Sequence, residues 1–241
     1  MDFLVFQIQA PISAWGETAV GEYRPTANYP SESALLGLLA AALGIERADE
    51  ATHQALQTGY AFAVGVQSTG RLLRDYHTAQ VPGRVALKNR PHRNRQDELN
   101  LPKDDLNTIL STRDYRQDAA CLVAVKASQV APYSLQELAR CLQQPKFVLY
   151  FGRKACPPAV PLWPKVMAAD NALAALTQYQ HALEEAGAEN IQSLEQLVWG
   201  GEIEAGVVED IQVIRKDRLL SRQKWQFGDR VENVAFLGGQ K

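Results

Sequence analysis

The chain has 241 residues, of which 46% are hydrophobic and 22% are charged, and its formal net charge is −2. These values are typical of a folded globular protein and exclude a disordered, collagen-like or coiled-coil chain. Because the net charge is close to zero, a nucleic-acid-binding role has to be argued from local clusters of Lys and Arg.

The N-terminal residues lack the basic start and the small-residue cleavage site of a secretion signal. The longest apolar stretch, residues 34–45, is shorter than the ~18 residues that cross a bilayer. Cys121, Cys141 and Cys156 are far apart and have no metal-ligand spacing. We therefore expect a cytoplasmic protein with reduced thiols, no membrane contact, no metal and no cofactor.

The first elements of the chain are a strand and a buried helix. Residues 3–9 alternate as a strand does, and Pro11 is expected to prevent its continuation as a central member of the sheet. Ser31 as N-cap and Gly44 as the residue after the last turn bound a helix that is apolar nearly all round. Gly37 in its middle costs about 1 kcal/mol relative to Ala, which indicates a close approach to another backbone.

The rest of the first 160 residues continues this alternation. Its predicted elements are a polar helix at 48–57, a strand at 60–67, a strand at 120–127, a helix at 134–142 that opens with a capping box, and a strand at 146–150. This order predicts an α+β fold in which residues 1–160 form a ferredoxin-like or RRM-like palm. A long insertion at 71–118 separates its two middle strands.

Residues 161–241 are predicted to form a small C-terminal domain, because four prolines between 157 and 164 interrupt the regular pattern. A helix near 171–185 and strands near 207–214 and 231–237 are expected there. The sequence assigns this region no role.

The sharpest local signal lies inside the insertion, where residues 84–95 contain cations and no acid. The cations are Arg84, Lys88, Arg90, Arg93 and Arg95. Such a run suits a phosphate backbone, because each cation that neutralises a phosphate also releases counterions. An exposed, solvated loop explains the run equally well. Its place as an insertion in an RRM-like sheet favours RNA.

Two similar motifs, LRDYH and TRDYR, flank the basic run. Each places an Arg two residues before a Tyr, Arg74 with Tyr76 and Arg113 with Tyr115, so that the two side chains share a face of an extended segment. A guanidinium beside a phenol ring suits phosphate binding and stacking on an unpaired base. An Arg–Asp salt bridge is the commoner role of either motif alone.

Two further segments combine cations with aromatic residues or glycine. In YFGRK, Gly152 allows a backbone or a ribose to approach closely, while Arg153 and Lys154 reach phosphate. The loop before the buried helix contains Arg24 and Trp15, and we interpret Trp15 as a lid on the core.

Enzyme motifs of ATPases, dehydrogenases, serine hydrolases and zinc proteases are absent from the sequence. One catalytic alternative remains, in which Tyr76 and His77 beside Lys88 or Arg90 assist RNA self-cleavage by general acid–base chemistry. A single His is more often structural, so binding is the favoured interpretation.

Five separated segments, in this order, resemble the CasD branch of the Cas-five family, which belongs to type I-E CRISPR Cascade. They are APISAWG at 10–16, YRPTANYPSESALLGLLAAALGI at 23–45, LLRDYHT at 72–78, STRDYRQD at 111–118 and YFGRKACPPAVPLW at 150–163. The resemblance covers about residues 1–165 and thins to fragments such as KWQFGDR beyond them.

The resemblance implies a palm, a thumb-like β-hairpin inserted at about 78–112, and a small C-terminal domain. It implies a non-catalytic subunit that caps the 5′ handle of the guide RNA (crRNA). Its expected partners are the Cas-seven backbone subunit and the large PAM-reading subunit, and through them target DNA. The residues that match the family's handle contacts are Arg24, Arg74, Tyr76, His77, Arg113, Gly152, Arg153 and Lys154. The alternative is a metal-independent endoribonuclease, because type I-C relatives cleave precursor crRNA.

Overall fold

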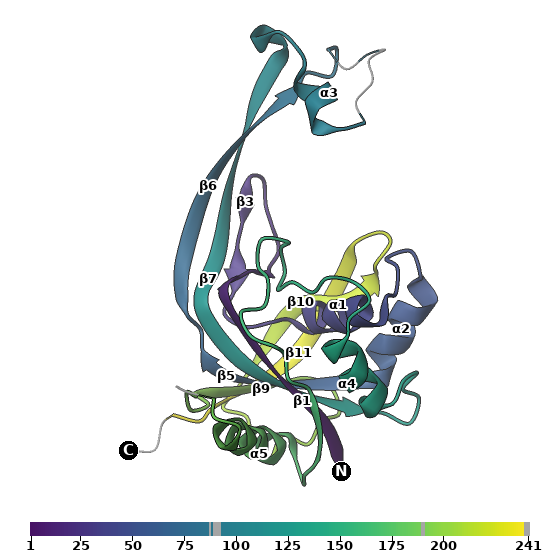
Figure 1. The fold of residues 1–241 in the computed structure, drawn as a ribbon, viewed down its shortest axis with the longest axis vertical. Helices are drawn as coiled ribbons and strands as arrows, with labels where there is room; N and C mark the ends of the chain where they lie inside the picture. The colour runs from purple at the N-terminus through teal and green to yellow at the C-terminus, as the bar shows by residue number, and fades with distance from the viewer. Residues whose placement is uncertain (87, 89–92, 189–190, 239–241) are drawn as a thin grey trace.

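The computed structural model describes residues 1–86, 88, 93–188 and 191–238 (Figure 1). The strands are β1 (Asp2–Ser13), β2 (Trp15–Gly16), β3 (Tyr23–Arg24), β4 (Thr26–Ala27), β5 (Tyr60–Ser68), β6 (Arg71–Pro82), β7 (Leu106–Ala127), β8 (Lys165–Ala168), β9 (Gln196–Trp199), β10 (Ile211–Ser221) and β11 (Gln226–Phe236). The helices are α1 (Glu32–Leu43), α2 (Glu50–Gly59), α3 (Arg95–Leu99), α4 (Leu135–Gln143) and α5 (Ala172–Glu185), with a 3₁₀ turn at Lys103–Asp105.

One nine-stranded sheet organises the described chain. Its order is β10-β11-β9-β5-β7-β1-β8, and β3 and β6 also pair with β7. All neighbours are antiparallel except β3, which runs parallel to β7. A mixed architecture of helices and a large antiparallel sheet is therefore confirmed. β9 to β11 continue this sheet through the pairing of β9 with β5, and the division into domains at residue 160 stays a prediction.

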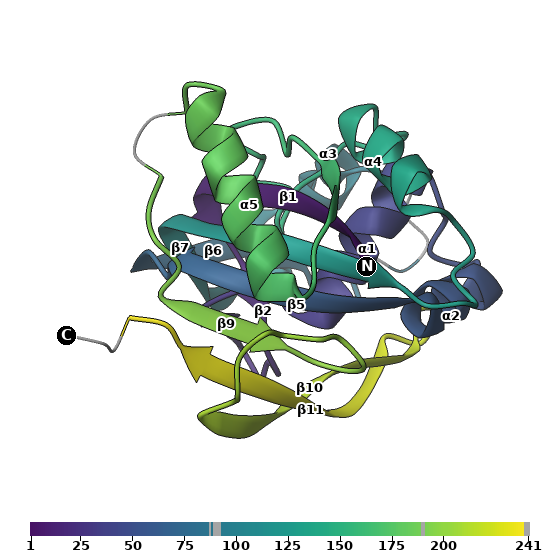
Figure 2. The same cartoon turned by 90° about the horizontal axis from the view of Figure 1, so that it is seen from below.

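The central strands bury both of their faces, because each carries apolar side chains at successive positions. In β1, Leu4 and Phe6 point into one core and Phe3 and Val5 into the other. The first core lies under α1, α2 and α4, and the second lies under α5. Figure 2 shows α5 crossing its own face of the sheet. The sheet is thus a rigid platform between two helical layers.

The buried helix begins and ends where the sequence predicts. The Ser31 side chain accepts a hydrogen bond from the Ala34 N–H, and Gly44 adopts the left-handed conformation with φ of 78°. The expectation that another backbone approaches Gly37 is wrong. An added Cβ there would lie 2.5 Å from the Nη2 atom of Arg222, so a side chain and not a backbone approaches the helix.

Beyond Pro11 the first strand continues to Ser13, with Ile12 opposite Gln117 of β7, but not as a central strand. β8 pairs only with residues 2–5 of β1, so the strand has β7 as its one strand partner around Pro11. A proline fits such a position, because no ladder donor is required on the open side.

The strand predicted at 146–150 does not form. The Lys146 and Phe147 N–H groups donate to the carbonyl oxygens of Ala42 and Ala41, at 3.0 and 3.1 Å. The segment therefore satisfies the free carbonyl groups at the end of α1. The place beside β1 is taken by β8, which the prolines at 157–164 precede.

The remaining predicted elements form with shifted ends. The strand at 60–67 and the helix at 134–142 are present as β5 and α4, and α2 lies two residues later than expected. In the C-terminal region, Asn171 caps α5 by accepting from the Ala174 N–H. The strand expected at 207–214 begins at Ile211 and runs to Ser221, and its partner is β11.

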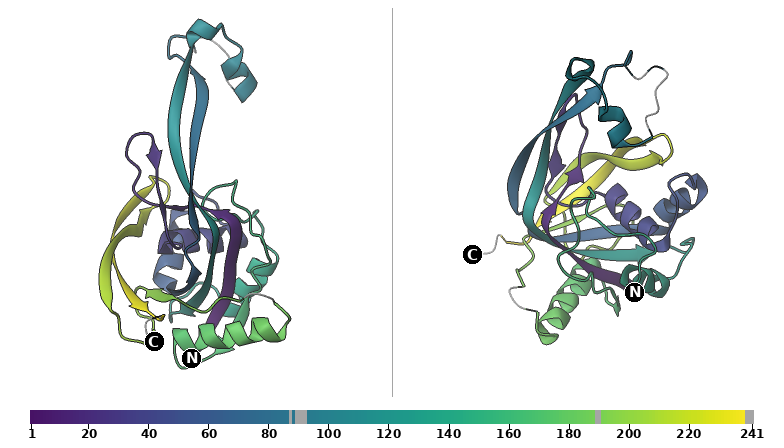
Figure 3. Two further views of the ribbon diagram at one scale, coloured as in Figure 1. Left: turned by 90° about the vertical axis from the view of Figure 1, so that its left-hand side faces the viewer. Right: turned by 45° about the horizontal axis from the view of Figure 1, so that its top comes forward.

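β6 and the first half of β7 form a long hairpin that leaves the sheet. Their register runs from Arg71 opposite Gln117 to Pro82 opposite Leu106. The second half of β7 pairs with β1 and β5 inside the sheet. Figures 1 and 3 show this hairpin, called the arm from here on, projecting from the palm with α3 near its tip.

Within the described residues, no helix combines the length and apolar character needed to cross a membrane.

Candidate nucleic-acid interface

The two Arg-Asp-Tyr motifs lie directly opposite each other at the root of the arm. In the β6–β7 register Arg74 faces Asp114, and Asp75 faces Arg113. Opposite residues of an antiparallel pair share a face, and neighbours along a strand do not. Arg74 and Tyr76 therefore lie on one face of the arm, the Arg74 face, and Arg113 and Tyr115 lie on the other, the Arg113 face.

On the Arg74 face, a carboxylate organises the cation. Arg74 Nε donates to Asp114 Oδ1 at 2.9 Å, and Arg74 Nη2 donates to Oδ2 at 3.1 Å. The Tyr23 hydroxyl donates to the same Oδ2 at 2.6 Å. Asp114 is buried, and the hydrogen bond from Arg74 holds its pKa below the ordinary value, whereas the bond to Asp114 raises the pKa of Tyr23. The salt-bridge interpretation of this motif is the one that the structure shows.

On the Arg113 face, β3 places a second arginine beside the first. β3 pairs in parallel with β7 so that Arg24 lies next to Arg113. Arg24 Nη1 donates to the carbonyl oxygens of Gly21 and Tyr23, at 2.5 and 3.1 Å. Arg113 Nε donates to Ser111 Oγ at 3.3 Å. Each guanidinium thus retains further N–H donors for a ligand.

Arg153 joins this face from the loop between α4 and β8. Its guanidinium lies 4.5 Å from the ring centroid of Tyr115, which is buried. Its Nη1 and Nη2 atoms donate to the carbonyl oxygens of Asp114 at 2.9 Å and of Arg24 at 3.2 Å. Arg153 therefore fixes β3, β7 and its own loop to one another, while Lys154 beside it is exposed.

Gly152 has a backbone role at this junction. Its φ is +88°, and an added Cβ would lie 1.7 Å from the carbonyl oxygen of Ala14. The close approach expected at this glycine is thus made by the protein's own backbone. Trp15 next to Ala14 is only 4% exposed, and its ring lies 5.8 Å from that of Phe151, which confirms it as a lid on the core.

Tyr76 and His77 do not converge on a common site. They are neighbours on β6 and point to opposite faces of the arm. Tyr76 is 64% exposed, and His77 Nδ1 lies 3.3 Å from Asp75 Oδ2. Lys88 belongs to the tip of the arm, beyond the end of β6, and Arg90 lies outside the described residues. The geometry therefore gives the acid–base alternative no assembled group of residues.

The tip of the arm is cationic, with some of its charge paired. Arg84, Lys88 and Arg93 are exposed. Arg95 begins α3, where it pairs with Glu98 at 2.7 Å and donates to the carbonyl oxygen of Gln80. Lys103 is exposed as well, and the tip also contains Asp97, Glu98, Asp104 and Asp105, so its described residues carry only a small excess of positive charge.

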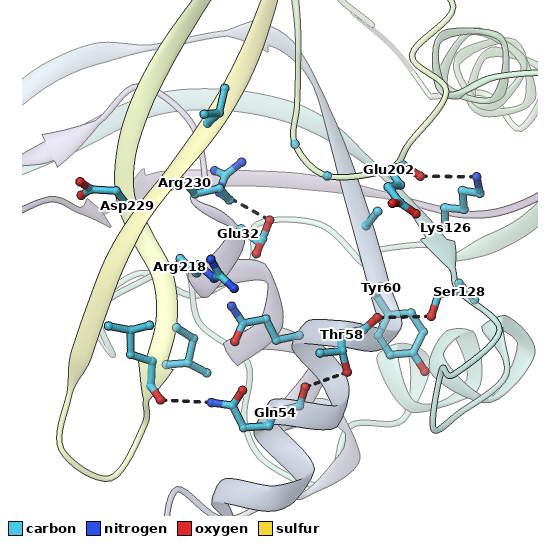
Figure 4. A pocket seen from close by; sticks show the side chains of 18 of the residues that line it. Glu32, Gln54, Thr58, Tyr60, Lys126, Ser128, Glu202, Arg218, Asp229 and Arg230 are labelled. Atoms are coloured by element: carbon cyan, nitrogen blue, oxygen red, sulfur yellow. Dashed lines mark hydrogen bonds and ion pairs between the residues drawn. The ribbon is translucent and has the colours of Figure 1, made fainter.

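A cleft of about 1080 Å³ lies on another part of the palm, between α2, the ends of β5 and β7, and the β10–β11 hairpin (Figure 4). Arg230 Nε lies 3.5 Å from Glu32 Oε2 across it, and Lys126 pairs with Glu204 at 2.5 Å. These cations are compensated by acids, so this cleft offers less unbalanced positive charge than the arm and its root do.

Comparison with known proteins decides the family. A family model described as CRISPR-associated protein (Cas_Cas5) matches residues 3–231. The chain belongs to the Cas5 family. The resemblance found in the sequence is thereby confirmed. The assignments to individual Cas5 site residues stay predictions.

Similar proteins place this Cas5 chain among CRISPR components. The Escherichia coli K12 protein named CRISPR system Cascade subunit CasD is 34% identical over 188 residues, which cover 74% of this chain and 77% of the relative. A solved chain described as CRISPR RNA-guided surveillance complex matches with a TM-score of 0.64 and 25% identity, covering 97% of this chain and 89% of its own. A second solved chain, described as Crystal structure of Cas protein, matches with a TM-score of 0.61 and 22% identity, covering 98% of this chain and 94% of its own. It shows the shared fold.

Proposed function

We propose that this chain is the CasD-type subunit of a cytoplasmic Cascade surveillance complex, and that it holds the 5′ handle of crRNA without cutting it. The E. coli relative is named as a Cascade subunit, and a solved neighbour is described as an RNA-guided surveillance complex. Both names support a guide-RNA complex as the setting in which this Cas5 chain acts.

The observation that carries the proposal is the convergence of arginines on the Arg113 face. Arg24 from β3 lies beside Arg113 from β7, and Arg153 from the loop after α4 holds these two strands together, with the exposed Lys154 next to it in sequence. A bent single strand presents several phosphates to one small surface. We therefore assign Arg24 and Arg113 as the leading handle contacts, with Arg153 as a positioning residue.

The fold supports the palm and thumb of the family plan. The strands β5-β7-β1-β8 lie in the order of a ferredoxin-like sheet, with antiparallel neighbours. The arm corresponds to the thumb, and its exposed tip cations suit RNA backbone without base reading. The Cas-seven backbone subunit and the large PAM-reading subunit are the partners that this role requires, and target DNA is met through them.

The same geometry supports a binding role without cleavage, because Tyr76 and His77 point to opposite faces of the arm. Incubation of the full chain with its cognate repeat RNA, in the absence of metal, is expected to leave the RNA intact. A product at one defined position that disappears in His77→Ala would establish the endoribonuclease alternative instead.

Handle binding is tested by assembling the complex with crRNA that carries a native or a scrambled handle. A charge-assisted hydrogen bond to phosphate is worth about 1.5 to 3 kcal/mol, so Arg113→Ala or Arg24→Ala should weaken handle binding about ten- to a hundredfold. Arg140→Ala on the exposed side of α4 is the matched control and should have no effect. Full preference for the native handle in both variants would refute the assignment.

A further inference from the structure

The turn between β10 and β11 holds an exposed tryptophan in an unfavourable backbone conformation. Trp225 has φ of 56°, and its side chain belongs to a residue that is 55% exposed. A left-handed conformation costs an L-residue about 1 to 2 kcal/mol, and such positions usually hold Gly or Asn. The ring packs edge-on against Phe227, with centroids 5.6 Å apart, and still leaves Trp225 55% exposed, so it is a candidate for contact with another molecule.

Two guanidinium groups lie against this ring. The Cζ atoms of Arg47 and Arg222 are 4.4 and 4.9 Å from the Trp225 ring centroid. Arg47 Nε donates to the carbonyl oxygen of Arg222 at 3.2 Å, which keeps the two residues together. Within the part of the chain that the structure describes, neither guanidinium forms an ion pair or hydrogen bond with an acidic side chain.

Glu50, the acid that contacts this turn, is occupied elsewhere. Both Glu50 carboxylate oxygens accept hydrogen bonds from backbone N–H groups of the turn, from Arg222 and from Gln223 at 3.1 Å each. Glu50 therefore holds the turn on α2 and does not pair with either guanidinium. Burial of Arg222 and the neighbouring charge of Arg47 lower the pKa of Arg222. Two adjacent, uncompensated cations are the arrangement that an anion would relieve.

The helix beneath is shaped to admit one of these cations. At Gly37 in α1, an added Cβ would lie 2.5 Å from Arg222 Nη2. Glycine inside a helix costs about 1 kcal/mol relative to alanine. Gly37 and Trp225 thus each lower the stability of the fold locally, and both belong to the same small cluster.

We propose that Arg47, Arg222 and Trp225 form a second contact for single-stranded nucleic acid, in which the two guanidinium groups hold a phosphate and the exposed ring stacks on the adjoining base. The proposal rests on the nucleic-acid-binding role given above but uses separate residues. Figures 1 and 3 show the β10–β11 turn on the side of the palm from which the arm projects.

A physical link connects the turn with the Arg113 face. Tyr150 lies near Arg222 and is 40% exposed. Gly152 and Arg153 follow two and three residues later, at the root of the arm. Residues 150–153 thus join the neighbourhood of Arg222 to the root of the arm.

The test measures binding of the full chain to labelled single strands that lack the handle sequence, by fluorescence anisotropy. Stacking on an aromatic side chain is worth about 1 to 3 kcal/mol per base, so Trp225→Gly should weaken binding about five- to a hundredfold. Arg47→Gln should weaken it about tenfold or more. Glycine relieves the left-handed strain, so Trp225→Gly should keep the wild-type melting temperature.

Gly37→Ala provides an independent variant. The new methyl group displaces the Arg222 guanidinium, whose end is flexible, while alanine favours the helix. We expect weaker binding of the single strand together with an unchanged or higher melting temperature. Arg140→Gln, on the exposed side of α4 and away from the arm, is the control for loss of one charge.

Comparing RNA with DNA identifies the ligand of this site. If the substitutions weaken the binding of RNA more than that of DNA, the site is assigned to the guide, and the reverse result assigns it to a target strand. Arg113→Ala should lose native-handle preference while Trp225→Gly retains it. If Trp225→Gly, Arg47→Gln and Gly37→Ala all bind handle-free strands as tightly as wild type, the second contact is refuted, whatever becomes of the handle assignment.

Discussion

Replacing Asp114 by Asn tests whether the root of the arm depends on one buried carboxylate. Asp114 accepts two hydrogen bonds from Arg74 and one from Tyr23. Asparagine keeps the shape but loses the charge, and its amide NH₂ faces a donor. The substitution should therefore loosen both β6 and β3 from β7 without removing any side chain from the core.

The expected loss of stability is smaller than that of a fully buried ion pair. Asp114 has a side chain only 3% exposed, but that of Arg74 is 55% exposed and regains water when the pair breaks. A hydrogen bond to a charged group contributes about 1.5 to 3 kcal/mol, and solvent access to Arg74 keeps the total near the value of one such bond. We expect about 2 kcal/mol, which for a chain of this size lowers the melting temperature by about 4 to 8 °C.

Thermal and urea unfolding of wild type, Asp114→Asn and the exposed control Asp104→Asn measure this difference. The folded pKa of Asp114 is below its ordinary value of about 3.9. Its contribution is therefore complete above that value and is lost as the pH falls through the folded pKa. The gap between wild type and Asp114→Asn should be constant near neutrality and shrink below about pH 4. Equal melting temperatures at neutral pH, or a gap that persists in acid, would refute the reasoning.

Three further substitutions have expected outcomes in the same assay. Gly152→Ala should cost more than about 2 kcal/mol, because its Cβ would meet the Ala14 carbonyl, whereas Gly187→Ala, with φ of 82° and open space, should cost only about 1. Arg230→Ala should lower the free energy of unfolding by about 3 to 5 kcal/mol, because it leaves Asp217 and Glu232, which Arg230 Nη2 contacts at 2.9 and 2.6 Å, without this partner. If Arg230→Ala is as stable as the control Arg218→Ala, this reasoning is contradicted. Tyr60→Phe should cost about 1 to 3 kcal/mol, because the Tyr60 hydroxyl bonds both the carbonyl oxygen and the N–H of Tyr133, at 2.6 and 3.0 Å; an undiminished melting temperature would count against that role.

Local signals were sufficient for the elements whose ends carry their own chemistry. Ser31, Ser134 and Asn171 cap helices where the sequence indicates a start. The segment at 146–150 misled because it is apolar and short, like a strand, while its N–H groups are bonded to the end of α1. Whether these N–H groups bond a neighbouring strand or the end of α1 depends on tertiary contacts, and the periodicity of apolar residues in the sequence carries no information about those.

For the candidate site, the sequence supplies the residues but not their faces. The Arg-x-Tyr spacing predicts correctly that Arg74 shares a face with Tyr76 and Arg113 with Tyr115. Only the register of β6 against β7 shows that the two pairs lie on opposite faces. Likewise, Arg47, Arg222 and Trp225 come from distant segments, and no motif joins them. The single local sign was the costly glycine at position 37, for which the sequence indicated a neighbouring backbone where the structure has the Arg222 side chain.

β7 is a single 22-residue strand that serves the palm with one half and the arm with the other. Because side chains alternate strictly, one residue inserted near Asp118 would exchange the two faces of the whole arm, and Arg74 would take the side of Arg113. Residues added between 83 and 105, at the tip, would leave the register below them untouched. The arm is thus free to change in length and charge at its end, while the spacing at its root is constrained to the single residue.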